Sequence, residues 1–310
     1  MALLLAVESP VLGSEAPPAW AYPVNPPGLK PAPDAGTPRH VPGSDAAFTL
    51  TQIRDLHFAP DWHPEDHPPM PDIVARGRKP DVLACGSCHR ADGSGGPENA
   101  KLAGLPAVYI AQQMADFKSG ARTTSVPERA PPQLMIATAK AINEQEIEAA
   151  AAYFSALQPR SAIRVVEAES VPKTRVTGWH LAVAADHETE PLGRRIVEVP
   201  ENLEYFALRD GRARFVAYVP PGSVQRGQAL VASGNGKTVA CGICHGPDLK
   251  GLGPIPGIAG RSPSYVVRQL YDFKTGARAG LWSALMKPVV EKLSVDDMIA
   301  LAAYAASLSP

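Results

Sequence analysis

Cys85-Gly-Ser-Cys88-His89 and Cys241-Gly-Ile-Cys244-His245 are the two stretches that decide how this chain folds. They contain all four cysteines of the 310 residues, so none is left over for a disulfide. C-x-x-C-H is the attachment pattern of c-type haem. Two thiols one helical turn apart can add to the two vinyl groups of one porphyrin, and the histidine that follows is then the proximal iron ligand. The cysteines of each stretch are therefore predicted to bind one haem covalently, with His89 and His245 on the irons.

Other origins for these two stretches are disfavoured. A chain of this composition should contain C-x-x-C-H by chance only ~10⁻³ times, and twice far more rarely. A thioredoxin-like redox pair needs a βαβ context, which the surrounding sequence lacks. The cysteine pairs of a four-cysteine zinc site are usually about 15–20 residues apart. Here Cys88 and Cys241 are 153 residues apart, so a zinc site would need an unusually long loop.

Both stretches lie inside an internal repeat. An offset of 156 residues aligns the two cysteine motifs, and it also aligns Tyr109 with Tyr265. At the same offset Asp116-Phe-Lys-Ser-Gly-Ala-Arg122 matches Asp272-Phe-Lys-Thr-Gly-Ala-Arg278. The first copy then carries five extra residues around 126–132, after which the offset is 151. Self-similarity of this kind indicates two copies of one structural unit.

The repeat predicts a mainly α-helical chain with two tandem haem domains. The expected divisions are a Pro-rich N-terminal arm at 1–71, domain 1 at 72–160, a partly β inter-domain segment at 161–221 and domain 2 at 222–310. The main predicted helices are 106–119 and 143–157 in the first copy, and 263–275 and 294–308 in the second. Asn143 and Ser294, each followed three residues later by an acidic residue, resemble capping-box starts.

The sixth iron ligand is predicted from the six methionines. Met114 and Met298 align with other residue types in the opposite copy, which indicates core packing. Met135 and Met286 align with each other, in segments expected to be loops before the last helix. They follow their motif histidines by 46 and 41 residues. A thioether ligand suits a low-spin electron carrier, so Met135 and Met286 are the predicted ligands.

Histidines outside the motifs are the alternative ligands. They are His40, His57, His63, His67, His180 and His187, and none is repeated between the copies. A lone histidine in a Pro-rich loop is more often a solvated side chain than a ligand. However, His57, His63, His67 and Met70 all lie just before the first haem domain. This segment could therefore cover a haem edge or bind a divalent metal.

Haem propionates are carboxylates, and when buried they need charged or hydrogen-bonding partners. The candidates are residues matched between the copies: Tyr109 and Tyr265, Arg122 and Arg278, Lys118 and Lys274. The alternative for the lysines and arginines is a solvated helix face. The second nitrogen of a proximal histidine usually donates to a backbone carbonyl. The loops after the motifs offer Pro97 in the first copy and Pro254 or Pro256 in the second.

The parts outside the repeat have their own composition. Most of the arm is rich in proline, which excludes regular helices and central strands there. We expect extended chain that wraps a surface, or disorder. The apolar residues 1–7 are consistent with the remnant of a secretory signal or anchor. In the inter-domain segment, Arg194-Arg-Ile-Val-Glu-Val199 and Ala213-Arg-Phe-Val-Ala-Tyr-Val219 predict short strands that could brace the two domains.

Overall composition gives broader limits. The net charge of −1 gives no indication of nucleic-acid binding. No run of about 18 apolar residues is present, so no membrane-spanning helix is predicted. Aromatic residues make up only 6% of the chain, and a bound porphyrin would help to fill cores that lack them.

With the two C-x-x-C-H motifs, the paired Asp-Phe-Lys-x-Gly-Ala-Arg segments and the late methionines, the chain resembles a tandem dihaem class I cytochrome c of the c4 type. The resemblance covers residues 72–160 and 222–310. It implies two small all-α folds, two haem c groups with His/Met ligation, a bacterial periplasmic location, soluble or peripheral, and one-electron transfer. The arm and the long inter-domain segment depart from that pattern.

Three functions remain open from the sequence. The first is a free electron carrier without catalytic residues, working between redox proteins such as a dehydrogenase, an oxidase or a reductase. The second is a dihaem enzyme, a peroxidase or a dehydrogenase of sulfur compounds, in which one haem has an open site and His57, His63 or His67 assists. The third is a cytochrome subunit fixed in a larger complex, which could be membrane-bound. The arm and inter-domain segment favour this third function.

Overall fold

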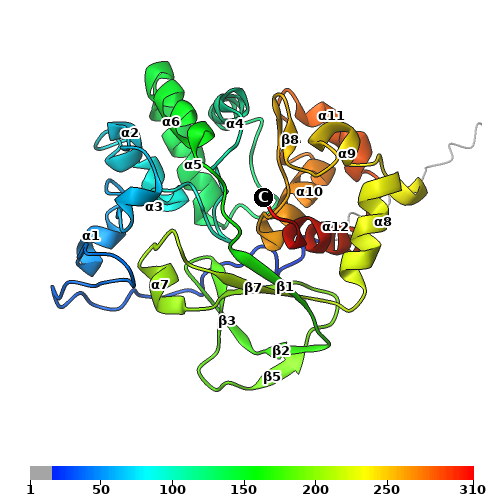
Figure 1. The fold of residues 1–310 in the computed structure, drawn as a ribbon, viewed down its shortest axis with the longest axis horizontal. Helices are drawn as coiled ribbons and strands as arrows, with labels where there is room; N and C mark the ends of the chain where they lie inside the picture. The colour runs from blue at the N-terminus through cyan, green and yellow to red at the C-terminus, as the bar shows by residue number, and fades with distance from the viewer. Residues whose placement is uncertain (1–15) are drawn as a thin grey trace, which may run out of the picture.

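The computed structural model describes residues 16–310, and the apolar start of the chain lies outside the described residues. Helices dominate the fold (Figure 1). In the first half they are α1 (Leu50–Arg54), α2 (Asp72–Ala75), α3 (Cys85–His89), α4 (Ala107–Ser119), α5 (Ala130–Ala141) and α6 (Glu144–Ala156). In the second half they are α7 (Leu203–Ala207), α8 (Ser223–Ser233), α9 (Gly242–His245), α10 (Pro263–Thr275), α11 (Ser283–Val290) and α12 (Val295–Ser307). Two 3₁₀ turns, η1 (Pro64–Asp66) and η2 (Gly234–Gly236), complete the set.

The four main predicted helices are present as α4, α6, α10 and α12. The helices α4 and α10 end at Gly120 and Gly276, whose φ angles of 78° and 82° favour glycine. The helices α6 and α12 begin after Asn143 and Ser294. Each of these side chains accepts from the backbone N–H three residues on, and the acidic residue there bonds back to the cap N–H. Both starts are therefore capping boxes.

Met135 and Met286 lie in helices, on α5 and α11, and the expectation of loops was wrong. Both helices contain prolines, which occupy different positions in the two. Pro131 and Pro132 lie in the first turn of α5, where the backbone N–H has no intrahelical partner to lose. Pro288 lies inside α11, where it cannot donate the intrahelical hydrogen bond that another residue would make.

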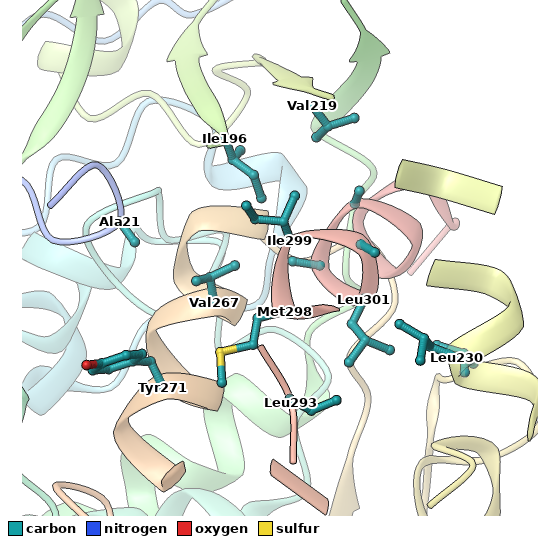
Figure 2. Close-up of a cluster of buried hydrophobic side chains, with 14 of the residues drawn as sticks. Ala21, Ile196, Val219, Leu230, Val267, Tyr271, Leu293, Met298, Ile299 and Leu301 are labelled. Carbon is teal, nitrogen blue, oxygen red and sulfur yellow. The ribbon is translucent and has the colours of Figure 1, made fainter. Parts of the chain in front are cut away.

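The core of the second repeat is shared with other parts of the chain. The helices α8, α10 and α12 pack around Leu230, Val267 and Met298. In Figure 2, Ala21 from the arm and Ile196 and Val219 from the inter-domain segment point into the same cluster. Met298 is therefore a core residue, as predicted. The alanine-rich α12 runs so close to α8 that a Cβ at Gly227 of α8 would clash with the α12 backbone.

The inter-domain segment forms the predicted small β element. The strands β1 (Ile163–Glu167), β7 (Phe215–Val219) and β6 (Val197–Pro200) make one sheet in that order, with β1 parallel and β6 antiparallel to β7. Smaller ladders of this segment are β2 (Ser170–Pro172) with β5 (Thr189–Pro191), and β3 (Thr174–Thr177) with β4 (His180–Val183). A further ladder, β8 (Gly251–Leu252) with β9 (Ile255–Pro256), lies in the second repeat. The parallel pair is possible because the hairpins supply a long connection between β1 and β7.

The described part of the arm wraps the surface mostly without regular structure, interrupted by the short helix α1 and the 3₁₀ turn η1. Tyr22 packs into the core of the second repeat, where its hydroxyl donates to the Asp272 carboxylate at 2.8 Å. Further along, the indole of Trp62 donates to the Leu208 carbonyl oxygen at 2.8 Å, just after α7. The Asp66 carboxylate accepts from Arg212 of the inter-domain segment. The arm thus contacts the second repeat at one end and the inter-domain segment at the other.

Within residues 16–310, none of the helices combines the length and the apolar character that crossing a bilayer requires.

Candidate haem-binding site

One continuous cavity of about 310 Å³ is lined by both repeats. His89 and Met135 contribute from the first repeat, and His245 and Met286 from the second. Both motif histidines and both predicted sixth ligands thus face a common interior space. Most of its wall is apolar, with contributions from α4, α5, α10 and α11. An apolar cavity with a few convergent polar groups is typical of a cofactor site.

The two motif histidines are held in the same way. Nδ1 of His89 lies 2.8 Å from the Ala100 carbonyl oxygen, and Nδ1 of His245 lies 2.8 Å from that of Pro256. Each acceptor follows its histidine by 11 residues. A carbonyl can only accept, so Nδ1 carries the proton and Nε2 is left as the electron-pair donor. Burial lowers the pKa of both histidines and so favours the neutral form that binds iron.

These contacts test the predicted acceptors for the histidines. Pro256 was one of the two candidates in the second repeat, and it is the acceptor. Pro97 was the candidate in the first repeat and is wrong, because the Ala100 carbonyl takes that place. The carbonyl of Pro97 instead accepts from Arg268 of the second repeat. The repeat offset of 156 relates Ala100 to Pro256, so aligning the copies identifies the acceptor that composition alone missed.

The cysteines lie in two pairs, Cys85 and Cys88 in α3, and Cys241 at the N-cap of α9 with Cys244 inside that helix, and none of them forms a disulfide. Burial raises the pKa of Cys85 to about 12 and that of Cys241 to about 11. A nucleophilic or redox-active cysteine needs a lowered pKa, so a thioredoxin-like pair does not fit this environment. Among residues 16–310, no group of three or more His, Cys, Asp or Glu side chains could hold a metal ion, which excludes the four-cysteine zinc site there.

Arg122 and Arg278 meet at the junction of the two repeats. The chain pairs there as an antiparallel bridge, with the N–H of Thr123 donating to the Ala277 carbonyl oxygen at 2.7 Å. Each arginine reaches the tyrosine of the opposite repeat. Arg122 donates to the Tyr265 hydroxyl at 3.1 Å, and Arg278 donates to the Tyr109 hydroxyl at 2.8 Å.

A pair of glutamines completes this junction. The amide oxygen of Gln113 accepts from Arg122 and from Arg278, both at 2.7 Å. Gln269 accepts from the same two arginines at 2.9 and 3.0 Å. All of these partners are neutral, although both guanidinium groups are buried and Nε of Arg278 has no partner. Buried cations need anions nearby, so this arrangement fits carboxylates such as haem propionates.

The charges on the cavity wall also indicate a site for carboxylates. In residues 16–310, six cationic side chains line it against three carboxylates: Lys101, Arg122, Arg129, Arg261, Arg268 and Arg278 against Glu98, Asp116 and Asp272. Burial lowers the pKa of Arg129 to about 9, and Nε of that arginine has no partner. Two haems bring four propionates, which would offset the excess of positive charge. The residues present therefore fit two haem c groups.

Sequence reasoning missed several of these residues. Gln113 and Gln269 are matched at the repeat offset, which is the signal that could have singled them out. Arg129 lies in the five extra residues of the first repeat and has no counterpart, so no repeat signal exists for it. Its place in the cavity follows from a long-range contact, in which its guanidinium donates to the Trp179 carbonyl oxygen at 3.2 Å.

Other predicted candidates lie outside the cavity. Lys118 and Lys274 are exposed on α4 and α10 and do not line it. His63 contacts the Asp210 carboxylate at 3.1 Å, and His67 contacts the Asp61 carboxylate at 3.2 Å. These two histidines, His57 and Met70 do not line the cavity. The side chains of His63 and His67 instead hold the arm through their carboxylate partners, and the alternative of a metal site beside them finds no ligand group in residues 16–310.

Comparison with known proteins identifies similar chains. The model of the cytochrome c family matches residues 74–158. Cytochrome c-554(548) of Halomonas halodenitrificans is 39% identical over 77 residues, which are 24% of this chain and 93% of that protein. Cytochrome c4 of Azotobacter vinelandii is 28% identical over 229 residues, 72% of this chain and 83% of that protein.

Two further similarities involve thiosulfate dehydrogenases. A protein of Thiomonas intermedia named thiosulfate dehydrogenase electron acceptor is 29% identical over 236 residues, 74% of this chain and 82% of that protein. The structure of thiosulfate dehydrogenase from Marichromatium purpuratum superposes with a TM-score of 0.51 at 27% identity. That match covers 84% of this chain and 40% of the other, so this chain corresponds to less than half of that protein.

Proposed function

This chain belongs to the cytochrome c family and carries two covalently bound haem c groups, and we propose that it transfers single electrons between redox proteins. The observation that carries the proposal is the pairing of a histidine and a methionine from each repeat on one shared cavity. When bound, haem c supplies an iron that takes up and releases one electron. Two haems held in a cavity shared by both repeats would be close enough to exchange electrons inside the molecule.

We infer that the two repeats bind their haems with the same set of residues. Cys85 and Cys88 would hold the first haem, and Cys241 and Cys244 the second. Nε2 of the histidine after each pair would bind one side of the iron, in the neutral state that burial favours. The thioether of Met135 or Met286 would bind the other side. A thioether raises the potential of the iron and leaves no open position for a substrate.

We infer that the junction of the repeats holds the haem propionates. Arg122 and Arg278, with Tyr109 and Tyr265, have donors there and no carboxylate partner among the residues that they contact. Arg129 adds a third buried guanidinium. The arginines would keep the propionates ionised and would exclude water from the space between the haems. Because each arginine reaches the opposite repeat, one network would serve both haems.

An electron carrier is favoured over a dihaem enzyme. A peroxidase-type site needs acid–base groups beside an open iron position. The histidines that could have served, His57, His63 and His67, do not line the cavity.

We also propose that the chain works in the bacterial periplasm and that it divides at the predicted boundaries, into 72–160 and 222–310 with an arm and an inter-domain segment. The resemblance to c4-type cytochromes, which the C-x-x-C-H motifs carry, supports this location because it implies a bacterial periplasmic protein.

An optical and redox titration of protein matured in a periplasm tests the electron-carrier function. We expect two haems per chain, two low-spin irons with the ferric absorption band of methionine ligation, and no binding of cyanide. A high-spin iron that binds cyanide or turns over peroxide would contradict the carrier function and favour the enzyme.

We propose further that the electron donor is a dehydrogenase of an inorganic sulfur compound. The similarity to a protein named thiosulfate dehydrogenase electron acceptor, over 82% of its length, supports this donor. Mixing the oxidised protein with a thiosulfate dehydrogenase and thiosulfate should reduce both haems, and thiosulfate alone should not. Reduction by thiosulfate alone would instead mean that this chain is itself the enzyme.

A further inference from the structure

One buried carboxyl of the inter-domain segment lies behind the wall of the haem cavity. Glu198 of β6 is only 2% exposed and does not itself line that cavity. Side chains alternate along a strand, so Glu198 points to the same side as Ile196, which lies in the core of the second repeat (Figure 2). Val197 and Val199 point the other way, into a cluster within the inter-domain segment. The strand therefore places Glu198 against the second repeat.

The two oxygens of this carboxyl have different surroundings at the start of α10. Oε2 accepts from the Ser264 hydroxyl at 2.5 Å, the Ser262 hydroxyl at 2.7 Å and the Ser264 backbone N–H at 3.1 Å. Oε1 is buried and has no hydrogen-bond partner among residues 16–310. The three donors and the positive end of α10 favour the ionised form, whereas burial and the unpartnered oxygen favour the protonated form.

These opposing effects bring the titration of Glu198 closer to neutral pH. Burial raises its pKa above the ordinary value of 4.5, although the hydrogen bonds from Ser264 and Ser262 and the charge of Arg268 act in the other direction. A carboxyl in this position responds to a change of charge nearby, because one charge more or less decides which of its two forms is the stable one.

Two small cavities join Glu198 to the wall of the haem cavity. One of about 10 Å³ is lined by Glu198 and His180, and another of about 20 Å³ lies on the other side of Glu198. Four residues of their walls also line the haem cavity: Lys101, Arg261, Tyr265 and Arg268. Cavities of this size hold about one water molecule each. A single layer of side chains thus separates Glu198 from the haem cavity.

The charged groups that face Glu198 are mainly cationic. They come from α10 and the residue before its N-cap, from the first repeat and from β4: Arg261, Tyr265, Arg268, Lys101 and His180. Burial lowers the pKa of His180 and so favours its neutral form. The next charged or titratable groups are Glu98 beside His180, and Tyr22 and Asp272 beside Arg268. Within residues 16–310, Glu198 supplies the only carboxyl on the walls of the two small cavities.

Arg261 connects this site to the proximal side of both haems. Its guanidinium donates to the Lys101 carbonyl oxygen at 2.6 Å and to the Gly257 carbonyl oxygen at 2.5 Å. These two residues directly follow Ala100 and Pro256, whose carbonyls hold the two motif histidines. The buried carboxyl therefore lies beside a link between the two histidine-binding loops, and its charge is expected to act on both irons.

We propose that Glu198 is a proton-binding site coupled to the reduction of the haems. The proposal rests on the electron-carrier function. An electron that enters from a redox partner brings one negative charge into a buried site, which makes the carboxylate less stable. One proton from solvent then binds Oε1 of Glu198, so that one O–H bond forms and the added charge is cancelled. When the electron leaves to an acceptor, that bond breaks and the proton returns to solvent.

Redox titration of the haem-loaded full chain at a series of pH values measures this coupling. We expect the fully reduced protein to bind the proton about tenfold more tightly than the fully oxidised protein. Because binding is linked in both directions, the two potentials should fall as pH rises, by about 59 mV in sum for that tenfold difference. They should be level at low pH, where the carboxyl is protonated in both redox states, and level again at high pH.

Glu198→Gln replaces the carboxyl by a neutral amide of the same size. Its potentials should lose this fall and stay at the low-pH values of the unmodified protein, since the amide imitates the protonated carboxyl. Glu188→Gln is the matched control in the same inter-domain segment, at a side chain that is 61% exposed, and it should keep the fall. An undiminished fall in Glu198→Gln would overturn the proposal, because another group, such as His180 or a haem propionate, would then take up the proton.

Infrared difference spectra between the reduced and oxidised protein give a second readout, which a merely structural role of Glu198 would not produce. The unmodified protein should gain the C=O stretching band of a protonated carboxyl on reduction, and Glu198→Gln should lack it. If Glu198→Gln does not fold, Glu198→Asp keeps a carboxyl and should shift the frequency of the band. A band that is missing from the unmodified protein, or that neither variant changes, would contradict the proposal.

The same titrations separate this proposal from the electron-carrier function. If the unmodified protein has no reversible one-electron couple at any pH, the electron-carrier function fails. If the couple is reversible but its potentials have the same pH dependence in the unmodified protein and in Glu198→Gln, only the proton-coupling proposal fails.

Discussion

Single residues set the reduction potential of each haem iron. We predict that Met286→His lowers the potential of one haem by roughly 200 mV, because an imidazole stabilises the ferric state more than a thioether does. The other haem should change little. Met135→His is the matched variant in the first repeat and should shift the other haem instead. Redox titration followed by absorption measures both potentials. An unchanged pair of potentials in either variant would mean that the substituted methionine is not a ligand.

The arginines at the junction of the repeats should act on both haems at once. Arg278 donates to residues of both repeats, and it brings a buried positive charge with no carboxylate partner among its contacts. Removing that charge favours the ferric state, which carries one more positive charge than the ferrous state. Arg278→Gln should therefore lower both potentials, by on the order of 60 mV, a tenfold change in a one-electron equilibrium. Redox titration followed by absorption measures both potentials in this variant as well.

The control for this variant is Arg76→Gln, at an arginine whose side chain is 74% exposed. Its potentials should match those of the unmodified protein. A shift of one haem only in Arg278→Gln would show that the junction does not serve the two haems jointly.

At the scale of elements, the arm is held by a histidine whose charge depends on pH. Burial alone would lower the pKa of His67, but hydrogen bonds with Asp61 and the Pro68 carbonyl, and the charge of Asp61, raise it overall. Since the pKa is higher in the folded state, the stabilisation is complete below the unfolded pKa of 6.5 and is lost as pH rises through the folded value. His67 also contacts the Tyr153 hydroxyl of α6 at 3.0 Å, so the loss would loosen the arm on domain 1.

His67→Gln should therefore destabilise the protein more at about pH 5.5 than at about pH 8.5. Urea unfolding at both values measures the difference in the free energy of unfolding between the variant and the unmodified protein. His40→Gln, at an exposed residue of the same arm, controls for the titration of the other histidines. If the effect of His67→Gln were larger at the higher pH, the charged form of His67 would not be the stabilising one.

For the whole molecule, the shared cores predict one cooperative unfolding transition. Residues of the arm and of the inter-domain segment are part of the core of the second repeat. The same two segments pack together beside the first repeat, at Trp62 and Leu208. Neither haem domain covers its apolar surface without them. Denaturant unfolding followed by haem absorption and by far-UV circular dichroism should give coincident curves, and two separated transitions would contradict this expectation.

The variant Tyr22→Phe tests whether the arm contributes to the stability of this single unfolding unit. The hydroxyl of Tyr22 is buried and donates to the Asp272 carboxylate, so its removal should cost about 1.5 kcal/mol of the free energy of unfolding. The transition should remain single. Tyr304→Phe, on α12 of the same domain, is the control for the loss of a hydroxyl.

The sequence by itself determined the haem motifs, the repeat, and the helices that begin at capping boxes and end at glycines. These features depend on residues a few positions apart, so local spacing was enough to predict them. The methionine segments were expected to be loops and are helices, with Pro131 and Pro132 in the first turn of α5 and Pro288 inside α11, so local sequence did not decide their structure.

Only the tertiary structure decided which residues from distant segments meet. The pairing of Arg122 with Tyr265 and of Arg278 with Tyr109 joins residues more than 140 positions apart. Arg129 enters the cavity through a contact with the inter-domain segment. The closure of the first motif by Arg209, against the exposure of Ile243 in the second, distinguishes two stretches of almost the same sequence. Burial depends on what packs over a segment, and the covering residues lie far away in the chain.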